Sequence, residues 1–93
     1  MNDIDVGVTE TAGGWSCAVT VRSPSGSTEH RVRVTRADLD RLAPGATDPA
    51  DLVRRSFGFL LEREPATSIL RSFDLPEIGR YFPEFERAIR AQT

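Results

Sequence analysis

Lysine is absent from this sequence: all twelve basic residues in its 93 positions are arginine. That absence excludes catalysis through a lysine Schiff base, phosphate binding by a P-loop lysine, and regulation by lysine acylation. The chain has one cysteine and one histidine, Cys17 and His30. One cysteine cannot form an internal disulfide, so we expect a reducing, cytoplasmic compartment. The two residues together are too few soft ligands for a zinc site, and no metal or other cofactor is predicted.

Long hydrophobic runs are also missing. The longest, residues 57–61, contains a glycine and is far too short to cross a bilayer. The acidic first residues lack the apolar segment of a signal peptide, so neither membrane insertion nor export is expected. Fourteen acidic residues outnumber the twelve arginines and give a net charge of −2, which argues against strong non-specific binding to nucleic acid. At this length, residues 1–93 are expected to form a single domain.

The first third of the chain alternates between apolar and polar residues, which is typical of half-buried β-strands. Three such runs, separated by a glycine-containing loop and by the turn at residues 23–27, predict an antiparallel meander over residues 1–35. A turn centred on residues 25–26 favours the register in which Val21 lies opposite His30 and Arg22 lies opposite Glu29. The predicted apolar face of the meander comprises Ile4, Val6, Val8, Trp15, Cys17, Val19, Val21, His30, Val32 and Val34.

Helical periodicity begins after Thr35, and three capping signatures mark expected helix starts. Residues 36–93 are therefore expected to form three to four helices packed on one face of the sheet. The predicted fold is α+β, with the element order β-β-β-α-α-α-α. The capping pairs are Thr35 with Asp38, Asp48 with Asp51, and Asp74 with Glu77.

The helical part carries three further expectations. The second helix, which ends near Glu64, has an apolar arc of roughly 200°, wide enough to place it at the centre of the helical layer. Phe59 lies at the margin of this arc and is the aromatic residue expected to be most exposed. A brief helix over residues 68–73 should contribute Leu70, among others, to the core. Pro83 lies inside the last helical stripe and should kink or divide that helix.

Catalytic constellations are missing from the pattern. In the predicted register Cys17 and His30 are four positions apart along the sheet, about 13 Å at 3.3 Å per residue, too far for a thiolate–imidazole pair. The carboxylate pairs in the helices have i,i+2 spacing, so their side chains point in different directions. The pair Gly13 and Gly14 lacks the strand–loop–helix context of a phosphate-binding loop. The sequence therefore predicts that the protein is not an enzyme.

Arginines near the third strand form the candidate binding site. Arg31 and Arg33 are predicted to point outward side by side on an edge strand, with Arg22 and Arg36 flanking it. Neither Arg31 nor Arg33 has an acidic residue at a favourable local spacing, and arginine binds phosphates and carboxylates through paired hydrogen bonds. These four residues are the predicted anion- or partner-binding group. The alternative is that charged side chains on an edge strand only prevent aggregation.

The helical half also carries a resemblance. Its segments are LVRRSFGFLLEREP at residues 52–65, SIL at residues 68–70 and YFPE at residues 81–84. They resemble a group of short uncharacterised bacterial proteins with a β-hairpin start and a helical tail. The likeness covers roughly residues 15–90 and implies this arrangement of elements, but it implies no activity, cofactor or binding site.

Two functional hypotheses follow from the sequence. The first is a small non-catalytic protein-interaction module that binds a protein partner or a second copy of itself, since two sheet edges and surplus aromatic residues favour association. The alternative is a nucleic-acid-binding or antitoxin-like regulator that uses Arg31 and Arg33 on the edge strand.

Overall fold

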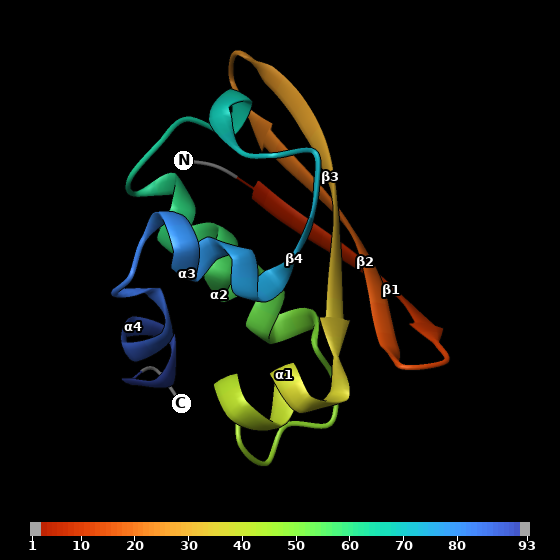
Figure 1. Ribbon diagram of the computed structural model, residues 1–93. Helices are drawn as coiled ribbons and strands as arrows, with labels where there is room; N and C mark the ends of the chain where they lie inside the picture. The colour runs from red at the N-terminus through yellow and green to blue at the C-terminus, as the bar shows by residue number, and fades with distance from the viewer. Residues whose placement is uncertain (1–2, 92–93) are drawn as a thin grey trace.

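The computed structural model describes residues 3–91 and has the predicted α+β fold, with a strand meander followed by helices (Figure 1). One strand and two short 3₁₀ turns appear in the half that was expected to be helical. In chain order the elements are β1 (Asp3–Thr11), β2 (Gly14–Ser23), β3 (Gly26–Thr35), α1 (Arg36–Leu42), α2 (Ala50–Leu61), the 3₁₀ turn η1 (Ala66–Ser68), β4 (Ser72–Asp74), the 3₁₀ turn η2 (Leu75–Glu77), α3 (Ile78–Tyr81) and α4 (Phe85–Ala91).

The short strand β4 changes which strands form the edges of the sheet. It pairs in parallel with β3, where Val32 lies opposite Phe73, and the sheet order is β1-β2-β3-β4. The prediction that β3 is an edge strand is therefore wrong. The prediction of a brief helix over residues 68–73 is also wrong, because this segment ends in β4. Three residues are too few to show a strand period in the sequence, and β4 exists because β3 offers it backbone partners.

The register of β2 against β3 differs from the prediction by two residues. Val19, not Val21, lies opposite His30, and Arg22 lies opposite Ser27 rather than Glu29. The chain reverses within a tighter turn, closed by Gly26 with a φ of 139°, a conformation that favours glycine. Because the shift is an even number of residues, each side chain stays on its predicted face of the sheet.

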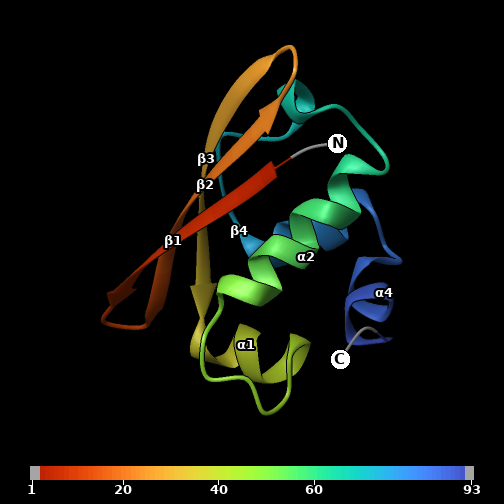
Figure 2. The ribbon, with the colours of Figure 1, turned by 180° about the vertical axis from the view of Figure 1, so that it is seen from behind.

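The helices of residues 3–91 lie on one side of the sheet, and no helix in this part of the chain covers the other face (Figures 1 and 2). The central helix is α2, as its wide apolar arc predicted, and it contributes Phe57, which is fully buried. No helix within residues 3–91 is long and apolar enough to span a membrane. The buried apolar core comprises Cys17, Val19, Val21, Val32, Val34, Leu39, Leu42, Ala43, Leu52, Val53, Phe57, Phe59, Leu60, Ile69, Phe73, Leu75, Ile78, Phe85 and Ile89.

The start of α1 follows its predicted capping signal, whereas the predicted pair of Asp48 and Asp51 forms no capping box, and α2 ends at Leu61 rather than near Glu64. The Thr35 hydroxyl accepts the Asp38 N–H and the Asp38 carboxylate accepts the Thr35 N–H, both at 3.0 Å, so the capping box at α1 is complete. The Asp48 carboxylate accepts the Ala50 N–H at 2.7 Å at the start of α2. Pro83 lies between α3 and α4 and divides the last helical stripe, as expected.

The expectation that Phe59 is exposed is wrong. Only 4% of Phe59 is exposed, because the segment after α3 folds back over this side of α2. Its ring makes edge-to-face contacts with Phe82 and Phe85, at centroid distances of 5.9 and 5.2 Å. The Arg63 guanidinium covers the same ring, 3.5 Å from its centroid. Phe82 and Phe85, more than 20 residues away in sequence, thus cover the margin of the apolar arc of α2 that a helical wheel leaves exposed.

Candidate functional site

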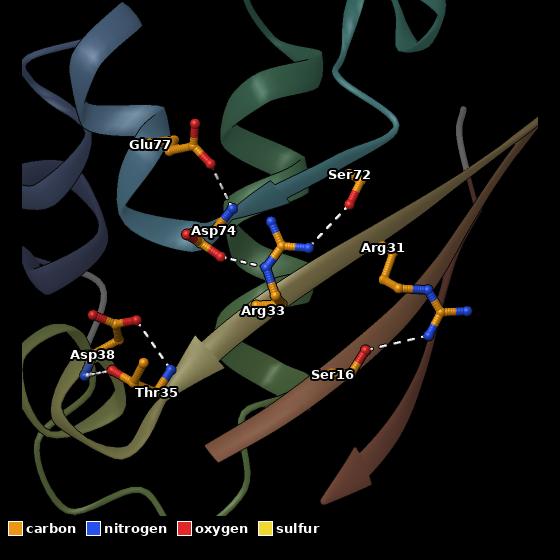
Figure 3. Close-up of polar contacts among 8 residues, drawn as sticks. All are labelled: Ser16, Arg31, Arg33, Thr35, Asp38, Ser72, Asp74 and Glu77. Carbon is orange, nitrogen blue, oxygen red and sulfur yellow. Dashed lines mark hydrogen bonds and ion pairs between the residues drawn. The ribbon is translucent and has the colours of Figure 1, made fainter. Parts of the chain in front are cut away.

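The predicted arginine pair lies on the open face of the sheet, but its two members differ in their partners (Figure 3). Arg33 donates to the Asp74 carboxylate at 2.5 Å and to the Ser72 hydroxyl at 3.1 Å. Its acidic partner is on β4, 41 residues away, so local spacing could not reveal it. Arg31 donates to the Ser16 hydroxyl at 3.2 Å and makes no ion pair with any residue in 3–91.

The two flanking arginines are also paired. Arg22 makes an ion pair with Asp5, and this hydrogen bond and charge raise the pKa of Arg22. Arg36 binds Glu10 at 2.6 Å and lies over Trp15. The four predicted residues therefore do not converge on one anion site, because three of the guanidinium groups already hold carboxylates.

A groove on the helical side gathers apolar side chains instead. It runs between the end of α2, the segment from η1 to β4, and α3, and has a volume of about 370 Å³. Its floor consists of side chains that are no more than 5% exposed, whereas Leu70 and Tyr81 at its rim are 47% and 66% exposed. The residues that line it are Leu60, Glu64, Ser68, Ile69, Leu70, Phe73, Glu77, Ile78, Tyr81 and Phe82.

Two acidic residues in its lining, Glu64 and Glu77, give this apolar groove a negative charge. Glu77 is held in place because its carboxylate accepts the Asp74 N–H at 2.7 Å. Glu64 is half-buried, and its carboxylate makes no hydrogen bond or ion pair with the residues of the described part of the chain. Glu64 also lines a second hollow of about 350 Å³ beside the β2–β3 turn. Among residues 3–91 no arginine lines the groove, so the charge of its lining is negative.

His30 positions the backbone of Leu70, a residue at the rim of the groove, through a hydrogen bond. Its Nδ1 lies 2.9 Å from the Leu70 carbonyl oxygen, which can only accept a hydrogen bond, so Nδ1 carries the proton. Its Nε2 then accepts the hydroxyl proton of Thr28 at 2.9 Å. The ring packs on Phe57, with centroids 5.2 Å apart. Because the Leu70 backbone is tied to β3 in this way, its side chain is left at the surface.

The sequence placed the groove residues in other roles. Leu70 was predicted to belong to the core of a short helix, and the structure shows this to be wrong. Tyr81 follows Ile78 at helical spacing, and a helical wheel does not indicate which of them a neighbouring element covers. The sequence signal that could have indicated an irregular segment at the groove is the cluster of turn-forming residues around Pro65 and Ser68, because such residues interrupt a helix.

The corrected register also affects the lone cysteine and histidine. Cys17 now lies opposite Val32, so it is two positions from His30 along the sheet, about 7 Å, rather than four. Both nitrogens of His30 are occupied, and burial, with a smaller contribution from the charge of Asp48, raises the pKa of the Cys17 thiol to about 11. A thiol with such a pKa is a poor nucleophile at neutral pH. Within residues 3–91, no group of three or more His, Cys, Asp or Glu side chains could hold a metal ion.

The raised pKa of Cys17 gives a pH-dependent stability. An unfolded thiol loses its proton near pH 9, whereas the folded protein keeps it to about pH 11, so the folded state loses stability as pH rises through that interval. The free energy of unfolding should fall by roughly 2 kcal/mol. Urea unfolding at pH 8 and pH 10.5 measures this difference. In Cys17→Ala the additional fall should disappear, and an equal fall in both chains would contradict the assignment.

Comparison with other proteins adds no relative to this description. No family model matches the chain, and searches of curated proteins and of solved structures found no match. What the structure provides is a small α+β fold with one charged sheet face, one helical face, and an apolar groove with acidic residues in its wall.

Proposed function

We propose that this protein is a non-catalytic interaction module that binds a segment of a partner protein in the groove between α2, β4 and α3. The single observation that supports it is the exposure of Leu70 and Tyr81 above a continuous apolar floor. Large apolar side chains grouped around a concavity are typical of binding sites, whereas isolated ones are common on any surface. Tyrosine at the rim favours a protein ligand, because tyrosine is enriched at interface positions that contribute most to affinity.

The charge of the groove defines the chemistry of its ligand. The half-buried carboxylate of Glu64 lacks a cationic partner among residues 3–91, and Glu77 adds a second negative charge. A carboxylate that is partly removed from water gains most from a charged hydrogen-bond donor. The ligand that fits is therefore a peptide segment with a large aliphatic or aromatic side chain for the floor and a neighbouring arginine or lysine for Glu64.

The nucleic-acid-binding alternative has less support. Three of its four arginines are engaged with carboxylates, and the strand that carries Arg31 and Arg33 lies inside the sheet. The open face also carries Glu29, which is exposed, makes no ion pair with any residue in 3–91 and repels phosphate. We therefore place the binding function at the groove rather than at the open sheet face.

Selection from a random peptide library displayed on phage tests this proposal. We expect the enriched peptides to combine a large apolar residue with arginine or lysine one to four positions away. Their affinity, measured by fluorescence anisotropy, should fall about tenfold in Glu64→Gln, which corresponds to roughly 1.4 kcal/mol. It should fall further in the double variant Leu70→Ser/Tyr81→Ser, because the apolar rim is removed.

The matched control is Glu29→Gln, which removes one negative charge from the open sheet face, away from the groove. Its affinity for the enriched peptides should equal that of the unmodified chain. The assigned charge preference would be contradicted if the enriched peptides lacked arginine and lysine and bound equally well to Glu64→Gln. Binding that survives loss of Leu70 and Tyr81 would contradict the groove itself.

A further inference from the structure

Strand β1 is a long edge of the sheet, and no other strand of residues 3–91 pairs with its outer side. It spans nine residues and pairs only with β2 in the sheet, while α2 packs beneath it. Every second backbone N–H and C=O of an edge strand points away from the sheet and is free to pair with another strand. Val8, on the helical face of β1, is 37% exposed and is one of the exposed large apolar residues within 3–91.

The usual protections of an edge are weak in β1. It contains no proline, and its pairing with β2 is unbroken from Asp3 to Thr11, with no bulge to twist it away. Two of its three carboxylates are neutralised within the chain, Asp5 by Arg22 and Glu10 by Arg36. The opposite edge differs, because β4 has only three residues and is followed at once by η2. The fold protects one edge by shortness and leaves the other long and regular.

We propose that β1 pairs antiparallel with β1 of a second copy, so that the two four-stranded sheets form one continuous sheet. The two-fold axis passes at Val6, which lies opposite Val6 of the second copy. In this register Ile4 lies opposite Val8 of the other copy, so each half-exposed apolar side chain on the helical face meets another apolar one. A carboxylate faces no carboxylate, because Asp3 lies opposite Thr9 and Asp5 lies opposite Gly7 of the second copy.

The other registers are less favourable on the same criteria. A shift of one residue in pairing would place apolar residues of one copy beside polar residues of the other. Centring the axis on Asp5 sets two carboxylates directly opposite each other, and centring it on Gly7 sets Ile4 against Glu10. Only the axis at Val6 matches all the apolar residues of the helical face while keeping like charges apart.

Gly7 provides a test of both the dimer and its register. A Cβ added at Gly7 would meet only the Ala18 carbonyl oxygen at 3.9 Å, an ordinary contact, so the monomer accepts a side chain there. In the proposed dimer Gly7 faces Asp5 of the second copy twice, once on each side of the axis. Gly7→Asp should therefore weaken the dimer and Gly7→Lys should strengthen it, while Gly7→Thr serves as the uncharged control.

The experiment is sedimentation equilibrium of the full chain from micromolar to millimolar concentration. We expect reversible association from 10.3 kDa to twice that mass. Relative to Gly7→Thr, the dissociation constant should rise roughly 2- to 30-fold in Gly7→Asp and fall by a similar factor in Gly7→Lys, because the axis repeats each cross-strand pair. Thermal unfolding of dilute samples confirms that each variant monomer is folded.

Three results would overturn the proposal. One is a chain that remains at 10.3 kDa at the highest concentration. Another is a dimer whose dissociation constant is the same in all three Gly7 variants, which would place the interface elsewhere. The third is weakening by both Gly7→Asp and Gly7→Lys, which would indicate an axis at Gly7 itself.

The dimer is independent of the peptide-binding proposal, because the groove lies beside β4 and the dimer forms along β1, at the opposite edge of the sheet. The proposed pairing leaves both grooves open on the same face of the extended sheet. Loss of dimerisation in Gly7→Asp should leave the affinity for a single peptide unchanged. It should reduce binding only to ligands that carry two copies of the peptide.

Discussion

Gly14→Ala should destabilise the protein by about 3 kcal/mol or more, a large share of the total stability of a domain this size. A Cβ at Gly14 would overlap the Val34 carbonyl oxygen and come within 2.7 Å of the Thr35 Cα. Both are backbone atoms of β3 just before α1, so the clash cannot be relieved by turning a side chain. The expected drop in melting temperature is roughly 10–25 °C, measured by circular dichroism.

The neighbouring Gly13 is the matched control for this substitution. A Cβ at Gly13 meets no atom within 4 Å, so Gly13→Ala should change stability by less than about 0.5 kcal/mol. Both variants make the same change in adjacent positions, and their difference isolates the contact with β3. Equal melting temperatures for the two variants would contradict the close approach of Gly14 to the end of β3.

Phe57→Ala should cost about 3–5 kcal/mol of unfolding free energy, because it removes a fully buried aromatic ring from the centre of the core. The ring of Phe57 lies 5.2 Å from that of His30 and 6.1 Å from that of Phe73, measured between centroids. It therefore joins α2 to β3 and to β4. Urea unfolding measures the loss, and the amide resonance of Leu70 should shift because His30 positions that residue.

Phe57→Leu keeps an apolar side chain at this site and should cost clearly less, about 1.5 kcal/mol. A second comparison is Phe82→Ala, which removes a half-buried ring at the groove and should also cost less than Phe57→Ala. A loss below about 1 kcal/mol in Phe57→Ala would be inconsistent with a central position in the core. Peptide binding that is reduced in Phe82→Ala but not in Phe57→Leu would support the role of the groove.

Local signals predicted a large part of the fold correctly. The alternation over residues 4–8 and 15–34 defined the three strands of the meander and their buried face, and the capping box of Thr35 and Asp38 marked the start of α1. Pro83 divided the last helical stripe as expected. These features depend on residues within a few positions of each other, so the sequence carries them directly.

The candidate functional site could be predicted from the sequence much less well than the fold. Local spacing identified Arg33 as unpaired, but Asp74 reaches it from a strand 41 residues later. The peptide groove was missed because its rim residue Leu70 lies in a segment whose conformation depends on pairing with β3 and on the hydrogen bond from His30. Neither interaction has a short-range signature.

The sequence by itself excluded lysine chemistry and an internal disulfide, because it has no lysine and one cysteine. Its alternating strands and capping boxes also determined the α+β class and the buried face of each strand. The tertiary structure alone decided that β3 is an inner strand, that Arg33 is paired, and that Leu70 and Tyr81 border a groove. The physical reason is the range of the interactions. Periodicity and capping act within a few residues, whereas strand order, ion pairing across a sheet and the covering of an apolar face arise only when distant segments pack together.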